Sequence, residues 1–274
     1  MLLLLLFACT DGIELGEQTQ PSPDTVEIEV VGDALLPELL LSHERGLYEA
    51  PFDLSIRSEG ASLRVTFDGS DPRSSDTALE EPSPLQLRVD PSHALGGHQA
   101  QAVLLRVVAQ GSDGLSSRVQ THTYLFPGEL AALSPDNEAP GSDWPAPYAT
   151  NNDNDPRQAI DYGIDPQVVQ DYGELLEPAL RALPSISLVT EVANLFDEDE
   201  GIYMNALEHG REWERPTSFE VLDADGEQIQ ADAGLRIRGG WSRHSSCPKH
   251  AFRLHFRQEY GPGRLDFPLF GPEG

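Results

Sequence analysis

Short segments in the first half of the chain alternate apolar and polar residues with a period of two. In residues 52–56 and 63–67 every second side chain is apolar, and this pattern places the apolar side chains on one face of a β-strand. Turn-forming residues separate the segments. We therefore predict a small β-sandwich over residues 35–127. Its expected strands cover residues 52–56, 63–67, 85–89, 103–109 and 119–124.

A helical period replaces the strand period after Asp165. Asp165 is a suitable N-cap, and Pro166 suits the first helical turn. Pro178 lies inside the helical segment, where a proline costs about 3 kcal/mol, so we expect a kink or break near Glu177. Pro184 ends the element. The apolar face contains Val168, Val169, Tyr172, Leu175, Leu176, Ala179, Leu180 and Leu183.

Strand-like alternation returns after this helix. Residues 186–189 and 217–222 are expected strands, and the turn residues 223–226 indicate a hairpin. These elements predict a mixed α and β domain over residues 167–274. A stretch rich in Pro, Asn and Asp, residues 128–166, is expected to link this domain to the sandwich.

Two further segments, residues 235–238 and 251–256, predict a sheet with one cationic face. Phe252, Leu254 and Phe256 fall on the face that would enter the core. The opposite face would extend back to Lys249 if the strand reaches that far. This face carries Lys249, Ala251, Arg253, His255 and Arg257.

The charge of the 274-residue chain is very uneven. The formal net charge is −28, but residues 232–274 contain seven Lys or Arg and four Asp or Glu, which leaves −31 for the remainder. Such an acidic body repels a nucleic-acid backbone, so we expect no nucleic-acid partner. A local cationic site for one small phosphate or carboxylate is compatible with this distribution.

A candidate phosphate site lies between the two cationic strands. Gly239 and Gly240 allow backbone angles closed to other residues, and Ser242 and Arg243 supply hydrogen-bond donors. Lys249 is the only lysine among 18 Lys and Arg residues, which suggests that arginine does not serve at this position. Backbone N–H groups, a hydroxyl and an ammonium group together form a phosphate cradle. A purely structural glycine hairpin beside a surface lysine is the alternative.

No metal ligands are expected in this chain. Residues 151–155 and 197–201 are rich in Asp, Asn and Glu but lack the spacing of a calcium loop. His244, His250 and His255 lie close in sequence without a recognised metal pattern.

The N-terminus has the features of an export signal. Residues 1–9 form an apolar run too short to cross a bilayer, and Leu-Phe-Ala-Cys at residues 6–9 resembles a bacterial lipobox with Cys9 as the lipidated residue. The polar residues 10–34 predict a disordered tether. Lipidation of Cys9 would leave Cys247 without a disulfide partner. We expect an exported lipoprotein of the cell envelope whose membrane contact is that lipid.

The sandwich also resembles a known accessory module. Residues 65–72, 105–109 and 123–126 are similar to the module at the C-terminus of chitobiase-type enzymes and beside fibronectin-like repeats. The turn residues in this stretch are ordinary hairpin chemistry. We therefore expect this domain to be a spacer rather than a binder.

The second domain resembles the N-terminal part of the CotH (spore coat protein H) kinase family. The resemblance covers roughly residues 160–274 and begins with Asp-Tyr-Gly-Ile-Asp-Pro at residues 161–166. Its further motifs follow in order at residues 184–190, 194–197, 201–205, 213–216, 234–240, 242–243, 248–249, 252–254, 259–261 and 268–270.

This resemblance implies an atypical protein kinase that transfers phosphate from ATP to Ser or Thr of an unidentified partner protein. The chain would supply the smaller lobe of a two-lobe fold, with Lys249 reaching the ATP phosphates. Mg²⁺ and the catalytic aspartates would belong to a larger lobe further along, so the catalytic residues are unknown and we expect this fragment to be inactive alone. The lid over the phosphates would contain Arg238, Gly239, Gly240, Ser242 and Arg243.

The expected architecture is therefore multidomain, an all-β sandwich followed by a truncated α+β small lobe. Glu214 and Arg215 are expected to form an internal ion pair. The alternative function is a noncatalytic surface or adhesion protein of the cell envelope, with a kinase-like scaffold and a sandwich that contacts carbohydrate. Export favours this alternative because ATP is scarce outside the cytoplasm.

Overall fold

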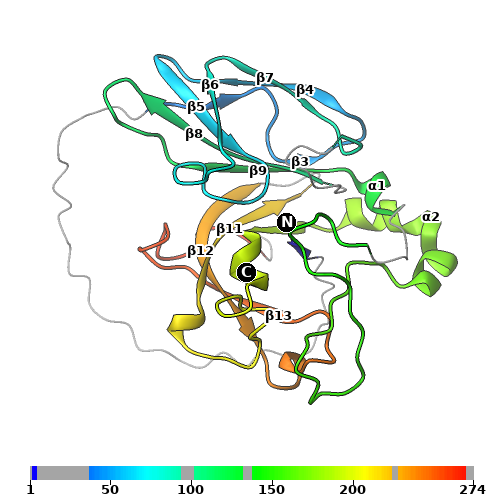
Figure 1. The fold of residues 1–274 in the computed structure, drawn as a ribbon. Helices are drawn as coiled ribbons and strands as arrows, with labels where there is room; N and C mark the ends of the chain where they lie inside the picture. The colour runs from blue at the N-terminus through cyan, green and yellow to red at the C-terminus, as the bar shows by residue number, and fades with distance from the viewer. Residues whose placement is uncertain (1, 5–36, 94–101, 132–137, 224–227, 270–274) are drawn as a thin grey trace.

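The computed structural model describes residues 2–4, 37–93, 102–131, 138–223 and 228–269. These residues form a mostly β protein with three sheets and few helices (Figure 1). Cys9 and the expected tether at residues 10–34 lie outside the described residues, so the lipid anchor and the tether stay predictions. Among the described residues, no helix has the length and apolar character needed to span a membrane.

Two sheets pack face to face in the first half of the chain. Leu54 from one sheet and Val65 and Val107 from the other are fully buried in the core between them. The three-stranded sheet has the order β2 (Leu40–Leu41), β4 (Phe52–Arg57), β7 (Leu85–Val89). The five-stranded sheet has the order β3 (Gly46–Leu47), β9 (Gln120–Leu125), β8 (Ala102–Gly111), β5 (Ala61–Thr66), β6 (Leu79–Pro82).

The second domain is built on one antiparallel sheet. Phe219, Leu235 and Leu188 from three of its strands are buried in a separate hydrophobic core. The strand order is β1 (Leu2–Leu4), β10 (Ser185–Val189), β11 (Arg215–Leu222), β12 (Ile229–Arg238), β13 (Ala251–His255). Short helices lie around it: α1 (Pro127–Ala131), α3 (Val192–Phe196), and the 3-10 turns η2 (Arg211–Trp213) and η3 (Trp241–Arg243).

Strands β12 and β13 separate apolar and cationic side chains onto opposite faces, as the alternation predicts. In their register Leu235 lies opposite Leu254 on the face toward the core. Arg236 lies opposite Arg253 on the other face. The candidate site described below is built on this second face.

The predicted amphipathic helix is α2 (Pro166–Ala182), and the carboxylate of Asp165 caps it by accepting a hydrogen bond from the Gln167 N–H at 2.8 Å. The helix continues through Pro178, so the expected break does not occur, and the alternative of a kink near Glu177 stays a prediction. An ion pair of 2.8 Å between Arg181 and Glu177 spans the proline and supports this turn. No α2 side chain is fully buried, in contrast to a core helix.

Part of the expected linker is built into the second domain. Trp144 and Ile160 are buried, and the Trp144 ring lies 5.4 Å from the Phe196 ring. The backbones of Tyr148 and Ile160 exchange two hydrogen bonds of 3.0 and 2.7 Å. Burial of these two side chains removes a large apolar area from water, and this explains why the stretch packs against the second domain.

The two domains meet through a buried polar contact between β9 and β11, which lie side by side in Figure 1. Glu220 is fully buried and accepts hydrogen bonds from the N–H and hydroxyl of Thr123 at 3.2 and 2.5 Å. A guanidinium nitrogen of Arg45 lies 3.4 Å from the same carboxylate. Loss of water around Glu220 outweighs these partners and raises its pKa to about 7.

We expect this carboxyl group to make stability depend on pH. Its pKa rises from 4.5 in the unfolded chain to about 7 in the folded protein, so its contribution is present below pH 4.5 and is lost as the pH rises through 7. Over this pH range the free energy of unfolding should change by on the order of 3 kcal/mol. Urea unfolding of the wild type and the Glu220→Gln variant between pH 4.5 and 8 measures it. The variant should lack this slope, and an equal slope in both proteins would refute the assignment.

Candidate anion-binding site

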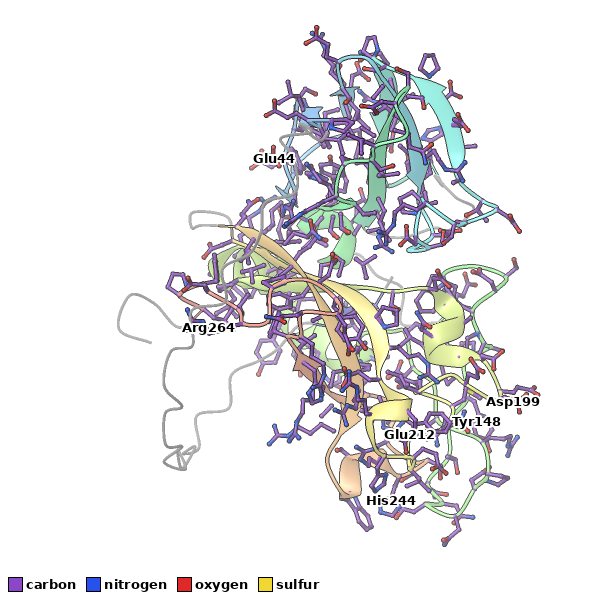
Figure 2. All side chains as sticks on the ribbon, turned by 90° about the vertical axis from the view of Figure 1, so that its left-hand side faces the viewer. Glu44, Tyr148, Asp199, Glu212, His244 and Arg264 are labelled. Atoms are coloured by element: carbon purple, nitrogen blue, oxygen red, sulfur yellow. The ribbon has the colours of Figure 1, made fainter. Side chains whose placement is uncertain are left out.

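A cavity of about 300 Å³ opens at the end of β12 and β13. Figure 2 labels Glu212 and His244, from the segments beside this cavity, at the end of the second domain remote from the β-sandwich. The lining is dominated by cationic and polar side chains. It comprises Ile202, Asn205, Glu208, His209, Gly210, Trp213, Arg236, Ile237, Arg238, Gly239, Arg243, Arg253 and His255.

Like charges are crowded on the sheet face beneath the cavity. Arg236 and Arg253 lie directly opposite each other in the register of β12 and β13, and Arg238 lies two residues along. Like charges at opposed positions destabilise a sheet. Within the described residues, the side chains of Arg238 and Arg253 make no hydrogen bond or ion pair, and both residues are exposed. Their charges are therefore available to a ligand.

One buried carboxylate neutralises part of this charge. Glu214 has a side chain only 1% exposed, and its oxygens lie 2.8 Å from a guanidinium nitrogen of Arg236 and 2.8 Å from one of Arg257. Burial alone would raise the pKa of Glu214, but the hydrogen bonds from Arg257 and Arg236 outweigh it and hold the pKa below its usual range. The expected pair of Glu214 with Arg215 does not form, because Arg215 donates to backbone carbonyls of Glu200 and Glu212 instead.

The position of Glu214 requires a glycine on the next strand. A Cβ atom at Gly234 would lie 2.5 Å from the Cγ and Oε1 atoms of Glu214. Any side chain at Gly234 would therefore displace the carboxylate from its two arginines. Gly234 belongs to the family-like motif at residues 234–240, and the structure gives it this packing role.

Arg243 contributes charge to the cavity but few free donors. Its guanidinium donates to the carbonyls of Gly239 at 2.7 Å, Ala206 at 2.6 Å and Glu208 at 2.9 Å, and also to that of Ile237. These acceptors are neutral, so the positive charge of Arg243 is not cancelled. Burial, and then the neighbouring charge of Arg253, lower its pKa, although arginine remains ionised. Arg243 fixes the turn and adds positive potential.

Of the two glycines in the turn, only Gly239 adopts a backbone conformation that other residues rarely take. Gly239 has φ +111°, which favours glycine, and a Cβ atom there would collide with the Ser242 hydroxyl. Gly240 has φ −104° and open space around it. The Ser242 hydroxyl donates to the Arg238 carbonyl at 3.1 Å and so closes the turn.

Two histidines of this region, His250 and His255, are at least partly buried. The Nδ1 atom of buried His250 lies 2.6 Å from the Ser242 carbonyl. Burial lowers the pKa of His250, and its Nδ1 atom is the donor in this contact because a carbonyl oxygen can only accept. Burial, and then the charge of Arg236, lower the pKa of His255, which lines the cavity.

Lys249 lies apart from the cavity. Strand β13 begins at Ala251, so its alternation does not extend back to Lys249. The ammonium group donates to the Gly163 carbonyl at 3.2 Å and lies 3.7 Å from a carboxylate oxygen of Asp161. Of the six residues proposed for nucleotide binding, the cavity lining includes Arg238, Gly239 and Arg243, and a nucleotide contact for Lys249 stays a prediction.

The sequence identified the cationic face but not the internal partner of Arg236. The alternation places Arg253 and His255 on the cationic face. It assigns Arg236 to a strand but gives no partner for its charge. The strand pairing could have indicated this partner. Arg215 of β11 pairs with Leu235 of β12, so the next residue on each side, Glu214 and Arg236, are neighbours across the strands. The described residues contain no group of three or more His, Cys, Asp or Glu side chains placed to hold a metal ion.

Comparisons with known proteins do not assign this chain. No protein-family model matches it, and no curated protein matches it. The sialic acid binding region of the Streptococcus sanguinis SK1 adhesin, solved with 3'sLn, is 12% identical with a TM-score of 0.22, and the match covers 73% of this chain and 47% of that one. The chain thus spans about half of that structure.

Two structures of the SrpA adhesin from Streptococcus sanguinis are similar at the same low level. One has 12% identity and a TM-score of 0.21 over 73% of this chain and 92% of that one. The other, a mutant, has 9% identity and a TM-score of 0.21 over 71% and 92%. At these TM-scores the likeness assigns neither fold nor ligand.

We expect the Glu214→Gln variant to be less stable than the wild type. The amide keeps the shape but leaves two partly buried guanidinium groups without a counter-charge, a loss of about 2 kcal/mol after allowance for their solvent exposure. Urea unfolding at pH 7 measures it. In the wild type, the stability contributed by the Glu214 carboxylate should be complete above about pH 4.5, the pKa in the unfolded chain. It should be lost as the pH falls from there through the lower pKa of the folded protein.

Glu259→Gln is the matched control for this substitution. The Glu259 side chain is 42% exposed, pairs with the exposed Arg211 and lies 4.0 Å from Arg257, so its loss should change stability by about 0.5 kcal/mol or less. Equal stabilities of the two variants would contradict the central role of Glu214.

Proposed function

We propose that the second domain binds the phosphate groups of a small anionic ligand in the cavity at the end of β12 and β13. The observation that carries this proposal is the pair of unpaired guanidinium groups, Arg238 and Arg253, beside Arg236 on one sheet face. Guanidinium groups match phosphate oxygens with two parallel hydrogen bonds, and a bound phosphate would relieve the repulsion between them.

The charge distribution of the chain supports a compact ligand rather than a polymer. The net charge of −28 repels extended polyanions, whereas the carbonyl-bound Arg243 keeps the potential of the cavity positive. A cavity of about 300 Å³ can enclose phosphate groups, but it is small for a whole drug-sized ligand, so the remainder of the ligand would lie at its rim.

A nucleoside triphosphate is the first candidate, because of the resemblance to CotH-type kinases. In that proposal the chain is the phosphate-holding part of an exported protein kinase that modifies Ser or Thr of a partner protein. The residues of this chain would bind and orient the phosphates, and Mg²⁺ would supply charge neutralisation at the transferred group. Its carboxylate ligands would come from outside the described residues.

A noncatalytic surface or adhesion protein is the second candidate. The cavity lining combines several cationic side chains with one carboxylate, Glu208. This composition suits an anion that is bound but not chemically changed. The ligand would then be the acidic group of a saccharide at the cell envelope, and carbohydrate contact by the β-sandwich belongs to the same candidate.

We expect Arg253→Gln to weaken ATP binding about tenfold, because it removes one charge-assisted hydrogen bond worth roughly 1.5 kcal/mol. Isothermal titration calorimetry of the whole chain with ATP measures the change. Binding should also weaken as the salt concentration rises. Preference for an acidic saccharide over ATP would favour the second candidate.

Two further variants serve as controls for this measurement. Arg264→Gln removes a positive charge whose side chain is 84% exposed and lies outside the cavity lining, so it should leave the affinity unchanged. Lys249→Ala tests the separate prediction for the lysine, whose ammonium group lies 3.7 Å from Asp161 and outside the cavity lining. A large loss with Lys249→Ala and none with Arg253→Gln would move the site to the lysine and refute the cavity.

A further inference from the structure

An exposed tryptophan stands at the rim of the cationic cavity. Trp241 is 70% exposed and lies in η3 between Gly239 and Arg243, both of which line the cavity. Tryptophan is largely buried in most proteins, because its indole carries a large apolar area. When a flat ligand group covers an exposed indole, apolar surface is removed from water, and this burial favours binding.

The exposed ring is held in place by its surroundings. The His244 ring lies 4.6 Å from the Trp241 ring, and the His244 N–H donates to the Trp241 carbonyl at 3.0 Å. The same turn is fixed by Arg243, which binds the Gly239 and Ala206 carbonyls, and by buried His250, which binds the Ser242 carbonyl. A surface fixed before binding loses little conformational entropy when a ligand arrives.

A second apolar side chain lies beside this turn. Arg243 donates to the carbonyls of both Ala206 and Glu208, which places the intervening Leu207 next to η3. Leu207 is 57% exposed. The segments next to the cavity lining therefore expose an aromatic and an aliphatic side chain, while the lining itself is cationic.

We propose that Trp241 is a stacking platform for the aromatic base of a ligand whose phosphates occupy the arginine cavity. This inference rests on the proposed phosphate-binding function and deepens it, because it assigns the ligand to the nucleotides rather than to simple phosphates or polyphosphates. Stacking on an aromatic side chain tolerates any base, so Trp241 would favour nucleotides as a class without selecting one base.

The experiment compares two ligands that share a phosphate chain and differ in the base. ATP and inorganic tripolyphosphate are titrated calorimetrically into the full chain and into its Trp241→Ala variant. We expect the variant to bind ATP about 5- to 100-fold more weakly, the range of one base stacked on an aromatic ring. Its affinity for tripolyphosphate should be unchanged.

Conservative and structural controls separate stacking from folding. Trp241→Phe keeps an aromatic face and should retain most of the ATP affinity. Because Trp241 is exposed, the melting temperature of Trp241→Ala should match that of the wild type. ATP, but not tripolyphosphate, should quench the tryptophan fluorescence of the wild type, and this difference should be absent from Trp241→Ala.

The outcomes distinguish this inference from the function on which it rests. Equal ATP affinity of the wild type and Trp241→Ala, or equal affinity of the wild type for ATP and tripolyphosphate, would overturn the stacking role and leave the phosphate site standing. Failure of the wild type to bind either ligand would overturn the phosphate site itself.

Discussion

The second domain depends on one buried carboxylate placed among arginines. Glu214 meets Arg236 and Arg257 at 2.8 Å, and it has room to do so because Gly234 carries no side chain. Without this negative charge, adjacent strands would present an uncompensated row of guanidinium groups in a partly buried setting. With it, part of the charge is satisfied internally, and Arg238 and Arg253 remain exposed to solvent.

A continuous polar face of the central sheet links the site to the rest of the molecule. Gln230 and Asp232 share a face of β12 with Arg236, since side chains on a strand alternate with a period of two. The β-sandwich covers the first part of this face, where Glu220 on β11 meets Thr123 on β9. The cavity occupies the other end. One polar surface therefore serves both as a domain contact and as a candidate binding site.

The sequence predicted most of the strands and the cationic face, because alternation with a period of two depends only on local chain geometry. It missed β1, β2, β3 and β6, which are two to four residues long and too short to show a period. It also misjudged part of the linker, where Trp144 and Ile160 are buried. Isolated apolar residues in a polar stretch show no pattern until the surface that covers them is known.

By itself the sequence determined an acidic chain with two β-rich parts, an amphipathic helix and a cationic end, since composition and periodicity are properties of neighbouring residues. Only the tertiary structure decided which charges cancel. Glu214 selects Arg236 and Arg257 over the adjacent Arg215, Lys249 lies against Asp161, and Arg253 is left unpaired among the described residues. Electrostatic interaction falls off with distance in space, and sequence separation does not fix that distance.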